Sequence, residues 1–229
     1  MRIVTIMPTY NRPREFTRAL ASVAKQTRLP DELIVVGDRC EKIVWRQVEG
    51  AVKLFRKHTG GRVIVKAHNL ARPGRDWGST PKNYGIMHSL APLVSYLDDD
   101  NWWTATHLAE LEYALVNNRA DLAWCGSFLH HPETGENVET RIPPEVPAFT
   151  KIDTSEMLHT RSILKKLDCP YGMWWRSHMY ATDWDLVDRL MGVGARCVSI
   201  KKALSHYTLG GSPVGAARNP GTKHMPNRP

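Results

Sequence analysis

Short apolar runs are separated, in the first half of this chain, by segments whose apolar residues recur at helical spacing. We predict buried strands over residues 3–7, 33–36, 63–65 and 93–97, because each run consists mainly of β-branched and other apolar residues. Polar residues follow each run directly. This pattern is typical of the parallel strands of an α/β protein, which are covered on both faces.

Helices are predicted between these strands. Asn11 is placed to cap the first helix, which has Pro13 in its first turn. The second helix ends at two glycines, 60–61, and a third covers residues 83–90. The apolar stripes are formed by Phe16, Leu20 and Val23 in the first helix and by Val44, Val48, Ala51 and Phe55 in the second. The order of elements predicts a largely parallel sheet with helices on both faces.

The pattern is weaker after residue 120. A strand is predicted over 121–128, followed by a hairpin turn at 134–137 and a proline-rich loop at 143–147. Two helices, 162–167 and 183–191, complete the ordered part. We therefore expect one domain over residues 1–209.

The segment 210–229 is rich in glycine, proline and basic residues and has no periodic apolar pattern. It is expected to be either disordered or a lid that orders on ligand binding.

Composition and charge narrow the class of protein. The chain has 229 residues, of which 42% are hydrophobic and 24% charged, as in globular proteins. The sequence shows no apolar run near the ~20 residues that cross a bilayer, and the first apolar run is too short for a signal peptide. We therefore expect a cytoplasmic protein with reduced thiols, since its four cysteines form no CxxC pair.

The net charge of +8 is concentrated near the two ends of the chain. A basic surface attracts nucleic acids, anionic membranes or phosphorylated small molecules, or it is simply a solvated face. Charge alone does not choose between these interpretations.

Polar side chains follow three of the predicted strands, and the carboxyl ends of parallel strands meet at one edge of a sheet. Pro8, Thr9, Tyr10 and Arg12 follow the first strand, Asp38 follows the second, and residues 98–100 follow the fourth. These residues are expected to form one cleft that contains an aromatic ring, cations and a carboxylate cluster.

The aspartate triplet 98–100 is costly at the end of a buried strand unless a cation neutralises it. Carboxylate oxygens suit Mg²⁺ or Mn²⁺. In an extended segment, Asp98 and Asp100 would point to the same side. The alternative is a strand end followed by a helix cap.

A second acidic group opens the helix 183–191. Asp183 is either a helix cap or a general base, which requires a carboxylate within hydrogen-bond reach of an acceptor hydroxyl. Aromatic residues precede it, and they either line an acceptor site or anchor a loop to the core. They are Trp174, Trp175 and Tyr180, accompanied by Arg176 and His178. Core packing is favoured for Trp102 and Trp103.

Several of these segments, taken in order, resemble family 2 glycosyltransferases, which have the GT-A fold. The opening IVTIMPTYNRPREFTRALASVAKQTRLPDELIVVGD is similar to the start of that family, with Asp38 at the end of the second strand. PKNYGI is similar to its R-N-x-G helix start, with Lys82 in place of arginine, and YLDDDN matches its L-D-x-D motif. ATDWDLVDRL resembles its E-D-x-D-L-x-x-R-L segment, with Thr182 in place of glutamate and Asp183 retained.

The resemblance covers residues 1–115 well and 180–207 in part. It implies a metal-dependent, inverting enzyme that moves a sugar from a nucleotide donor, with a UDP-sugar favoured, to an acceptor hydroxyl. Residues 1–115 would hold the donor and 116–209 the acceptor. The implied donor-site residues are Pro8, Thr9, Tyr10, Arg12, Asp38, Lys82, Asn83, Asp98 and Asp99; Asp98, Asp100 and His206 would hold Mn²⁺ or Mg²⁺, and Asp183 would be the catalytic base.

Three other classes of protein share some of these features. A nucleotidyltransferase would usually carry a glycine-rich phosphate loop after the first strand, and PTYNRP is not one. A nucleic-acid-binding module fits the basic ends but gives no reason for the carboxylate triplet. A glycosyltransferase that acts on hydroxymethylated bases in DNA combines both features. The acceptor is therefore a glycan, a small molecule or modified DNA.

Overall fold

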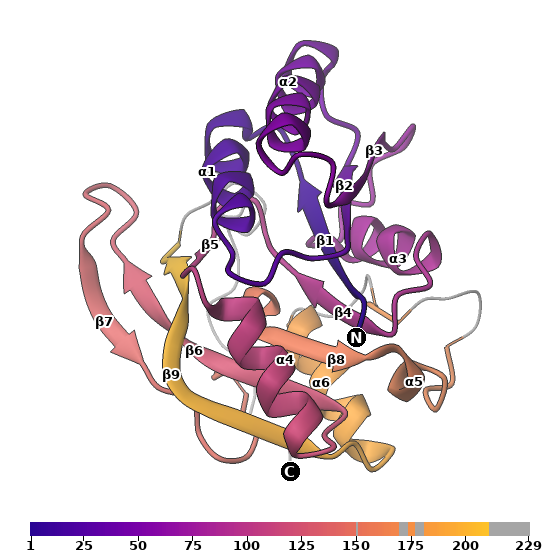
Figure 1. Cartoon of the computed structure of the whole chain (residues 1–229), viewed down its shortest axis with the longest axis vertical. Helices are drawn as coiled ribbons and strands as arrows, with labels where there is room; N and C mark the ends of the chain where they lie inside the picture. Colours follow the sequence, from indigo (N-terminus) through magenta and orange to yellow (C-terminus); the bar gives the residue numbers. More distant parts are fainter. Residues whose placement is uncertain (150, 170–173, 177–180, 211–229) are drawn as a thin grey trace.

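The computed structural model describes residues 1–149, 151–169, 174–176 and 181–210, and its strands form one mixed sheet (Figure 1). Its strand order is β3-β2-β1-β4-β8-β6-β9-β5, and β7 pairs with β6. The first half contains β1 (Ile3–Thr9), α1 (Pro13–Ala24), β2 (Glu32–Gly37), α2 (Lys42–His58), β3 (Ile64–Asn69), α3 (Ser79–Met87), β4 (Leu93–Tyr96), β5 (Trp102–Trp103) and α4 (His107–Asn117). The second contains β6 (Leu122–His130), β7 (Asn137–Arg141), the 3-10 helix η1 (Thr154–Glu156), β8 (Met157–Thr160), α5 (Arg161–Leu164), α6 (Thr182–Gly192) and β9 (Cys197–Thr208).

Strands β1 to β4 form the parallel part of the sheet, as the sequence pattern predicts. β1 lies between β2 and β4 and is parallel to both, and β3 is parallel to β2. Beyond β4 the sheet is mixed, because β8 is antiparallel to β4 and to β6, whereas β9 is parallel to β6. The carboxyl ends of β1, β2 and β4 therefore lie side by side and place their following loops together.

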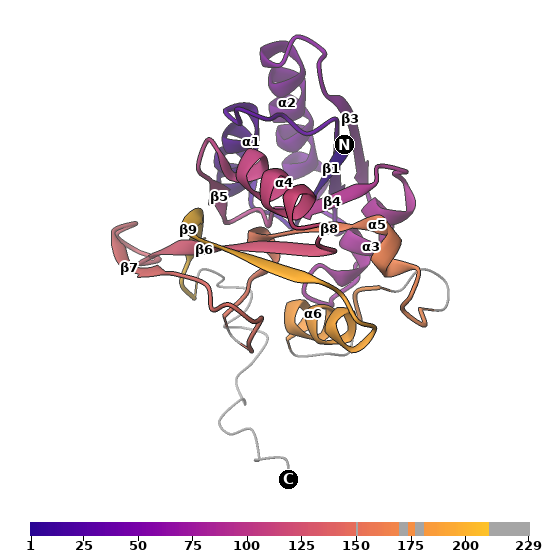
Figure 2. The same ribbon diagram turned by 60° about the horizontal axis from the view of Figure 1, so that its bottom comes forward.

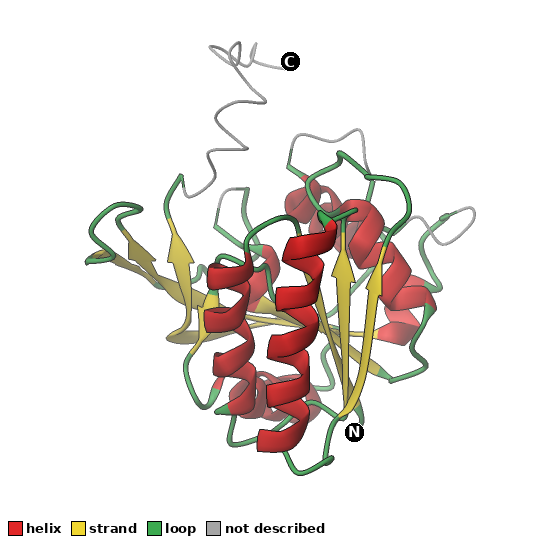
Figure 3. Cartoon of the chain, turned by 90° about the horizontal axis from the view of Figure 1, so that it is seen from above, coloured by secondary structure: helices red, strands yellow, loops and turns green. Residues whose placement is uncertain are grey.

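Alternating side chains of β1 belong to two hydrophobic cores, one on each face of the sheet. Ile3 and Met7 pack with α1, α2 and α4, and Val4 and Ile6 pack with α3, α5 and α6. Figures 2 and 3 show these helices on the two sides of the strands. The arrangement confirms the predicted α/β fold with a single domain.

Several predicted boundaries differ from the structure. Asn11 does not cap α1: its φ is 53°, Arg12 is the N-cap residue, and the Asn11 side chain accepts a hydrogen bond from the Glu41 backbone. α3 begins at Ser79, with Gly78 as its N-cap residue, and the Asp76 side chain accepts the Thr80 backbone N–H inside the first turn. The predicted helix 162–167 is only one turn, α5, and β8 and β9 were not predicted.

Two other predictions are confirmed. β6 and β7 form the antiparallel hairpin expected around 134–137, where Gly135 has a φ of 72°. All four cysteines are free thiols. The predicted tail lies outside the described residues from 211 onward. Within the described residues, the structure contains no helix of the length and hydrophobicity needed to span a membrane.

Two buried histidines make stability depend on pH. Burial lowers the pKa of His107 to about 3 and that of His159 to about 4, below the ordinary value of 6.5. The unfolded chain takes up these protons near pH 6.5, whereas the folded chain does not until far lower pH. The free energy of unfolding is therefore highest above pH 6.5 and falls as pH decreases toward 4.

We expect His107→Phe to reduce this pH dependence. His107 stacks on Trp103, so a phenyl ring can replace it without charging at low pH. The free energy of unfolding from urea titrations should fall less between pH 7 and pH 5 than in wild type, by about 2 kcal/mol. The exposed His58 gives a matched control, His58→Phe, which should retain the wild-type difference. An unchanged pH dependence in His107→Phe would contradict this assignment.

Candidate active site

The aspartate triplet lies at the carboxyl end of β4 in a turn, closed by a hydrogen bond from the Asn101 N–H to the Asp98 carbonyl. The sequence predicts an extended segment here, and the structure instead has a turn. Burial raises the pKa of Asp100, Arg12 lowers it, and the neighbouring Asp98 raises it. The turn brings the two predicted metal ligands together.

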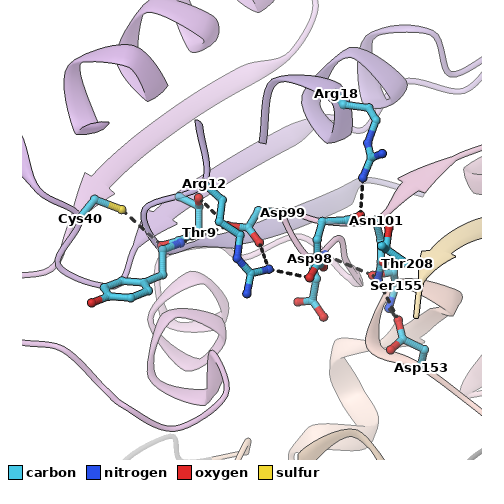
Figure 4. A network of polar contacts seen from close by, with 12 residues as sticks. Thr9, Arg12, Arg18, Cys40, Asp98, Asp99, Asn101, Asp153, Ser155 and Thr208 are labelled. Carbon is cyan, nitrogen blue, oxygen red and sulfur yellow. Dashed lines mark hydrogen bonds and ion pairs between the residues drawn. The ribbon is translucent and has the colours of Figure 1, made fainter. Parts of the chain in front are cut away.

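Asp99 points back toward β1 rather than into the cluster. Its carboxylate accepts hydrogen bonds from the Thr9 hydroxyl at 2.8 Å and the Tyr10 N–H at 3.1 Å, and it pairs with Arg12 at 3.3 Å (Figure 4). Burial and the neighbouring Asp100 raise the pKa of Asp99 to about 7, despite these partners. Asp99 thus fixes the turn against the end of β1.

Arg12 and Lys82 each neutralise one of the other two aspartates. Arg12 Nη1 lies 2.5 Å from Asp100 Oδ2, and Lys82 Nζ lies 3.4 Å from Asp98 Oδ1. Lys82 is buried, with its ammonium 4.5 Å from the centre of the Trp175 ring and 3.3 Å from the Thr154 hydroxyl. The replacement of the family's arginine by lysine therefore retains a fixed cation beside Asp98.

Asp183 is the second residue of α6 and does not cap the helix, and its role as a general base stays a prediction. The N-cap residue is Ala181, and Asp183 Oδ1 accepts the N–H of its neighbour Trp184 at 2.8 Å. Burial raises the pKa of Asp183, Lys82 lowers it and Asp98 raises it. A carboxylate with a raised pKa is the kind of group that can act as a general base.

Two residues that the sequence analysis did not single out also belong to this cluster. Asp153 is half-buried, and desolvation, Asp98, Glu156 and Asp183 raise its pKa well above the ordinary value. Tyr207 lies on β9, and its pKa is raised first by Asp153, then by burial and by the aspartates of the turn and Asp183. Asp153 had a sequence signal, the capping box D-T-S-E that starts η1, whereas Tyr207 had none.

Asn101 connects the aspartate turn to η1 and to the end of β9 (Figure 4). Its Nδ2 donates to Ser155 Oγ at 2.9 Å and to Asp153 Oδ1 at 3.3 Å, and its Oδ1 accepts from the Thr208 N–H at 3.4 Å. Ser155 Oγ also accepts the Asp98 N–H at 3.2 Å. The turn is thus joined to η1 through the side chains of Asp153 and Ser155 and to the end of β9 through the Thr208 backbone.

We expect Asn101→Ala to lower the free energy of unfolding by about 1–3 kcal/mol, because it leaves buried polar partners unsatisfied. Asn118→Ala is a matched control, since the exposed Asn118 makes one local hydrogen bond to the Ala114 carbonyl. The control should change stability by less than about 0.5 kcal/mol in the same urea titration. Equal losses in the two variants would show that Asn101 does not hold the turn.

Asn83 has a structural role in addition to any contact with a donor. Its Nδ2 donates to the Trp175 carbonyl at 2.8 Å, and its Oδ1 accepts the Trp175 N–H at 2.9 Å. Trp175 is buried in the hydrophobic core between the sheet and helices α3, α5 and α6. This position supports the interpretation that this tryptophan anchors its loop to the core. His178 and Tyr180, the other members of that aromatic segment, lie outside the described residues.

Asp38 lies directly after β2 and is nearly buried. Its Oδ1 accepts the Gly74 N–H at 2.5 Å, which fixes the loop that leads to α3. Gly78, which belongs to the same loop, lies beside Pro8 of β1. The predicted nucleotide-site residues of β1 and β2 therefore lie around one loop at the carboxyl edge of the sheet.

His206 pairs with Trp102 across β9 and β5, and their rings stack 4.8 Å apart. Its Nδ1 is hydrogen-bonded to His130 Nε2 at 2.8 Å, and burial lowers its pKa to about 4. Among the described residues, no three His, Cys, Asp or Glu side chains are grouped to hold a metal ion. His206 stays a prediction as a ligand, with Nε2 as the remaining ring nitrogen.

A match to a known family decides the class of this site. Residues 4–181 match the profile described as Glycosyl transferase family 2. The chain belongs to this glycosyltransferase family. A Bacillus subtilis relative, described as the uncharacterized glycosyltransferase YwdF, is 27% identical over 116 residues, which are 48% of this chain and 37% of YwdF.

Solved structures with the same fold include two glycosyltransferases. TarS from S. aureus has a TM-score of 0.69 at 20% identity, over 91% of this chain and 37% of TarS. Mannosyltransferase PcManGT from Pyrobaculum calidifontis, in complex with GDP-Man and Mn²⁺, has a TM-score of 0.70 at 17% identity, over 95% of this chain and 59% of its own. TarS 1-349 is also described in complexes with UDP and UDP-GlcNAc. This chain thus spans between about a third and three fifths of these relatives.

Proposed function

We propose that this family 2 glycosyltransferase moves a sugar from a nucleoside diphosphate donor, with a UDP-sugar favoured, to an acceptor hydroxyl with inversion. The observation that carries the proposal is the aspartate turn after β4, in which Asp98 pairs with Lys82 at 3.4 Å and Asp100 with Arg12 at 2.5 Å, together with the half-buried Asp183 at the start of α6. The donor would lie over residues 1–115 and the acceptor over 116–209.

The donor half offers recognition for each part of a nucleotide. Tyr10 follows β1 and would stack on the base, while Asp38 would accept a hydrogen bond from the base or ribose. Arg12 and Lys82 already bind carboxylates of the turn, so both cations are positioned where diphosphate charge would arrive. The complexes of TarS and PcManGT with nucleotide-sugars support a donor of this class.

The residues of the turn fit a divalent cation. Asp98 and Asp100 supply hard carboxylate oxygens, and burial, followed by the charge of Asp98, raises the pKa of Asp100 against the lowering effect of Arg12. Two protein carboxylates are enough where substrate phosphates complete the coordination of Mg²⁺ or Mn²⁺. Such a cation, when bound, would neutralise the charge that develops on the leaving nucleoside diphosphate. His206 remains a candidate third ligand.

Asp183 would remove the proton from the acceptor hydroxyl as the hydroxyl oxygen attacks the anomeric carbon. The bond to the nucleoside diphosphate breaks on the opposite side of that carbon, so one displacement inverts the configuration. Lys82 and Asp98 would contact the donor, and Asp183 would contact the acceptor. Burial raises the pKa of Asp183 and so makes it a stronger base than an exposed carboxylate.

Calorimetry tests this proposal directly. UDP, GDP and dTDP and their sugar conjugates are titrated into the protein with Mn²⁺, with Mg²⁺ or with EDTA. We expect one nucleotide, with UDP favoured, to bind in the presence of metal and to lose most of its affinity in EDTA. A folded protein that binds none of these compounds with either metal would contradict the proposal.

A further inference from the structure

The helix α2 carries aliphatic side chains on the face that points away from the sheet. Ile43 is 60% exposed and Leu54 is 68% exposed. Leu54 follows Ile43 by about three full turns of the helix, so both side chains project along one line on its surface. Gly50 lies between them on the same line. We call Ile43, Gly50 and Leu54 the apolar crest of α2.

The apolar crest is the part of α2 that lies farthest from the hydrophobic core. The buried residues of the helix are on its opposite side and pack with α1 and the sheet; they are Val48, Val52 and Phe55. Figure 1 shows α2 at one end of the long axis of the molecule. The two aliphatic side chains of the crest are therefore accessible to a partner.

Positive side chains border the apolar crest along one flank. They are all exposed and lie within about 100° of the crest around the helix axis; they are Lys42, Arg46, Lys53 and Lys57. Arg56 lies farther round the helix and donates to the Val65 carbonyl at 2.8 Å. The acidic residue of the helix, Glu49, accepts the indole N–H of Trp45 at 3.0 Å. The cations of α2 thus outnumber its single carboxylate.

The elements beside α2 add positive charge to this surface. α1 packs against α2 and carries the exposed Arg14, Arg18 and Lys25, and Arg62 is exposed just after α2. On the other side, Lys66 of β3 pairs with the buried Glu32 at 3.7 Å. The carboxylates of α1, of α2 and of the N-cap residue before α2 are Glu15, Glu49 and Glu41. The surface around the apolar crest therefore has an excess of cations.

The combination of an apolar crest with flanking cations selects one class of partner. Nucleic acids and phosphorylated small molecules are attracted to cations, but their phosphates offer nothing to exposed aliphatic side chains. A second copy of the same surface would bring like charges together. In an anionic bilayer, by contrast, aliphatic side chains enter the boundary between headgroups and acyl chains. Lysine and arginine side chains beside them reach the headgroup phosphates.

From this arrangement we propose that α2 is a docking surface for an anionic lipid bilayer, with the apolar crest inserted at the headgroup boundary and the flanking cations on the lipid phosphates. The helix has 17 residues and is about 25 Å long, so it lies along the bilayer rather than crossing it. Its first turn follows Asp38 closely, which places one end of the docked helix at the carboxyl edge of the sheet. The inference does not depend on the proposed function, because lipid binding requires neither donor nor acceptor.

The test measures binding of the full chain to vesicles and does not need its activity. The vesicles consist of phosphatidylcholine alone or of phosphatidylcholine with about 30% phosphatidylglycerol, and cosedimentation is measured from about 0.1 M to about 0.5 M NaCl. Binding to a short DNA duplex is measured in the same buffers by fluorescence anisotropy. The two probes separate a lipid surface from a nucleic acid.

Two double variants of α2 are compared with two controls. The charge variant combines Lys53→Glu with Lys57→Glu, and the crest variant combines Ile43→Ser with Leu54→Ser. One control combines Lys165→Glu with Lys166→Glu, which reverse two exposed lysines just after α5. The other is Leu90→Ser, which changes an 83% exposed leucine before β4. Circular dichroism shows whether each variant is folded.

We expect wild type to bind the anionic vesicles, to leave the neutral ones unbound, and to bind more weakly as salt increases. The charge variant should bind at least about 25-fold more weakly, since each cation near an anionic surface contributes about fivefold. The crest variant should bind about tenfold more weakly. Both controls should match wild type.

Folded wild-type protein that does not bind the anionic vesicles would overturn the inference. So would a charge variant or a crest variant that binds these vesicles as tightly as wild type does. Tighter binding to the DNA duplex than to the anionic vesicles would also overturn it and would assign the basic surface to a nucleic acid instead.

Discussion

Replacing Asp183 by asparagine is expected to lower kcat by about 10²–10⁴-fold, because the amide cannot take a proton from the acceptor hydroxyl. The change keeps the size of the side chain, and the amide oxygen can still accept the Trp184 N–H. Donor affinity should therefore change little, and the loss should appear in kcat at saturating donor. Steady-state transfer assays with calorimetry of donor binding separate the two quantities.

Asp188 provides the control for this variant. It lies on the same helix, α6, but is exposed. Asp188→Asn removes the same charge without touching the cluster and should leave kcat within about twofold of wild type, as for other surface substitutions. Transfer by Asp183→Asn at a rate near that of Asp188→Asn would remove Asp183 from the role of base.

The second large effect is expected for Asp100→Asn. This change removes one of two proposed carboxylate ligands and leaves Arg12 without its partner at 2.5 Å. We expect the Mn²⁺ concentration for half-maximal activity to rise by about 10–100-fold, with kcat/KM falling by a similar factor at fixed metal. Activity is measured across a Mn²⁺ titration, and circular dichroism with urea unfolding checks that the variant is folded.

Asp168→Asn, which alters an exposed aspartate, is the matched control and should leave the Mn²⁺ titration unchanged. If Asp100→Asn is folded and shows the wild-type dependence on Mn²⁺, the aspartate turn is not where a metal would be held. The same titration on Asp98→Asn would then show whether Asp98 alone binds the ion.

Local patterns in the sequence were sufficient to predict the donor half. Three local patterns each determine one element through contacts between near neighbours. They are the apolar run before Thr9 for β1, the stripe of Phe16, Leu20 and Val23 for α1, and the apolar residues before Asp98 for β4. The parallel order of β1 to β4 then follows from short crossover connections. This is why Thr9, Asp38 and the aspartate turn were expected at one edge of the sheet, where the structure places them.

The other half depends on contacts that no local pattern reveals. The residues of β9 do not alternate regularly between buried and exposed, so the strand has no period-2 pattern in the sequence. It pairs with β6 and with β5 at different points along its length. Tyr207 reaches the cluster only through that pairing. The direction of Asp99 was also beyond sequence reasoning, since it depends on the hydrogen bonds that Thr9 and Tyr10 donate from 90 and 89 residues away.

We propose that this chain takes a sugar from a nucleotide-sugar donor with a metal held at the aspartate turn. The most direct test is the release of nucleoside diphosphate from UDP-, GDP- and dTDP-sugars, measured for wild type with Mn²⁺, wild type with EDTA, and Asp100→Asn with Mn²⁺. We predict release from one donor, with a UDP-sugar favoured, that is abolished by EDTA and strongly reduced in Asp100→Asn. Release that is the same in all three samples, or no release from any donor by the folded wild-type protein, would contradict the account.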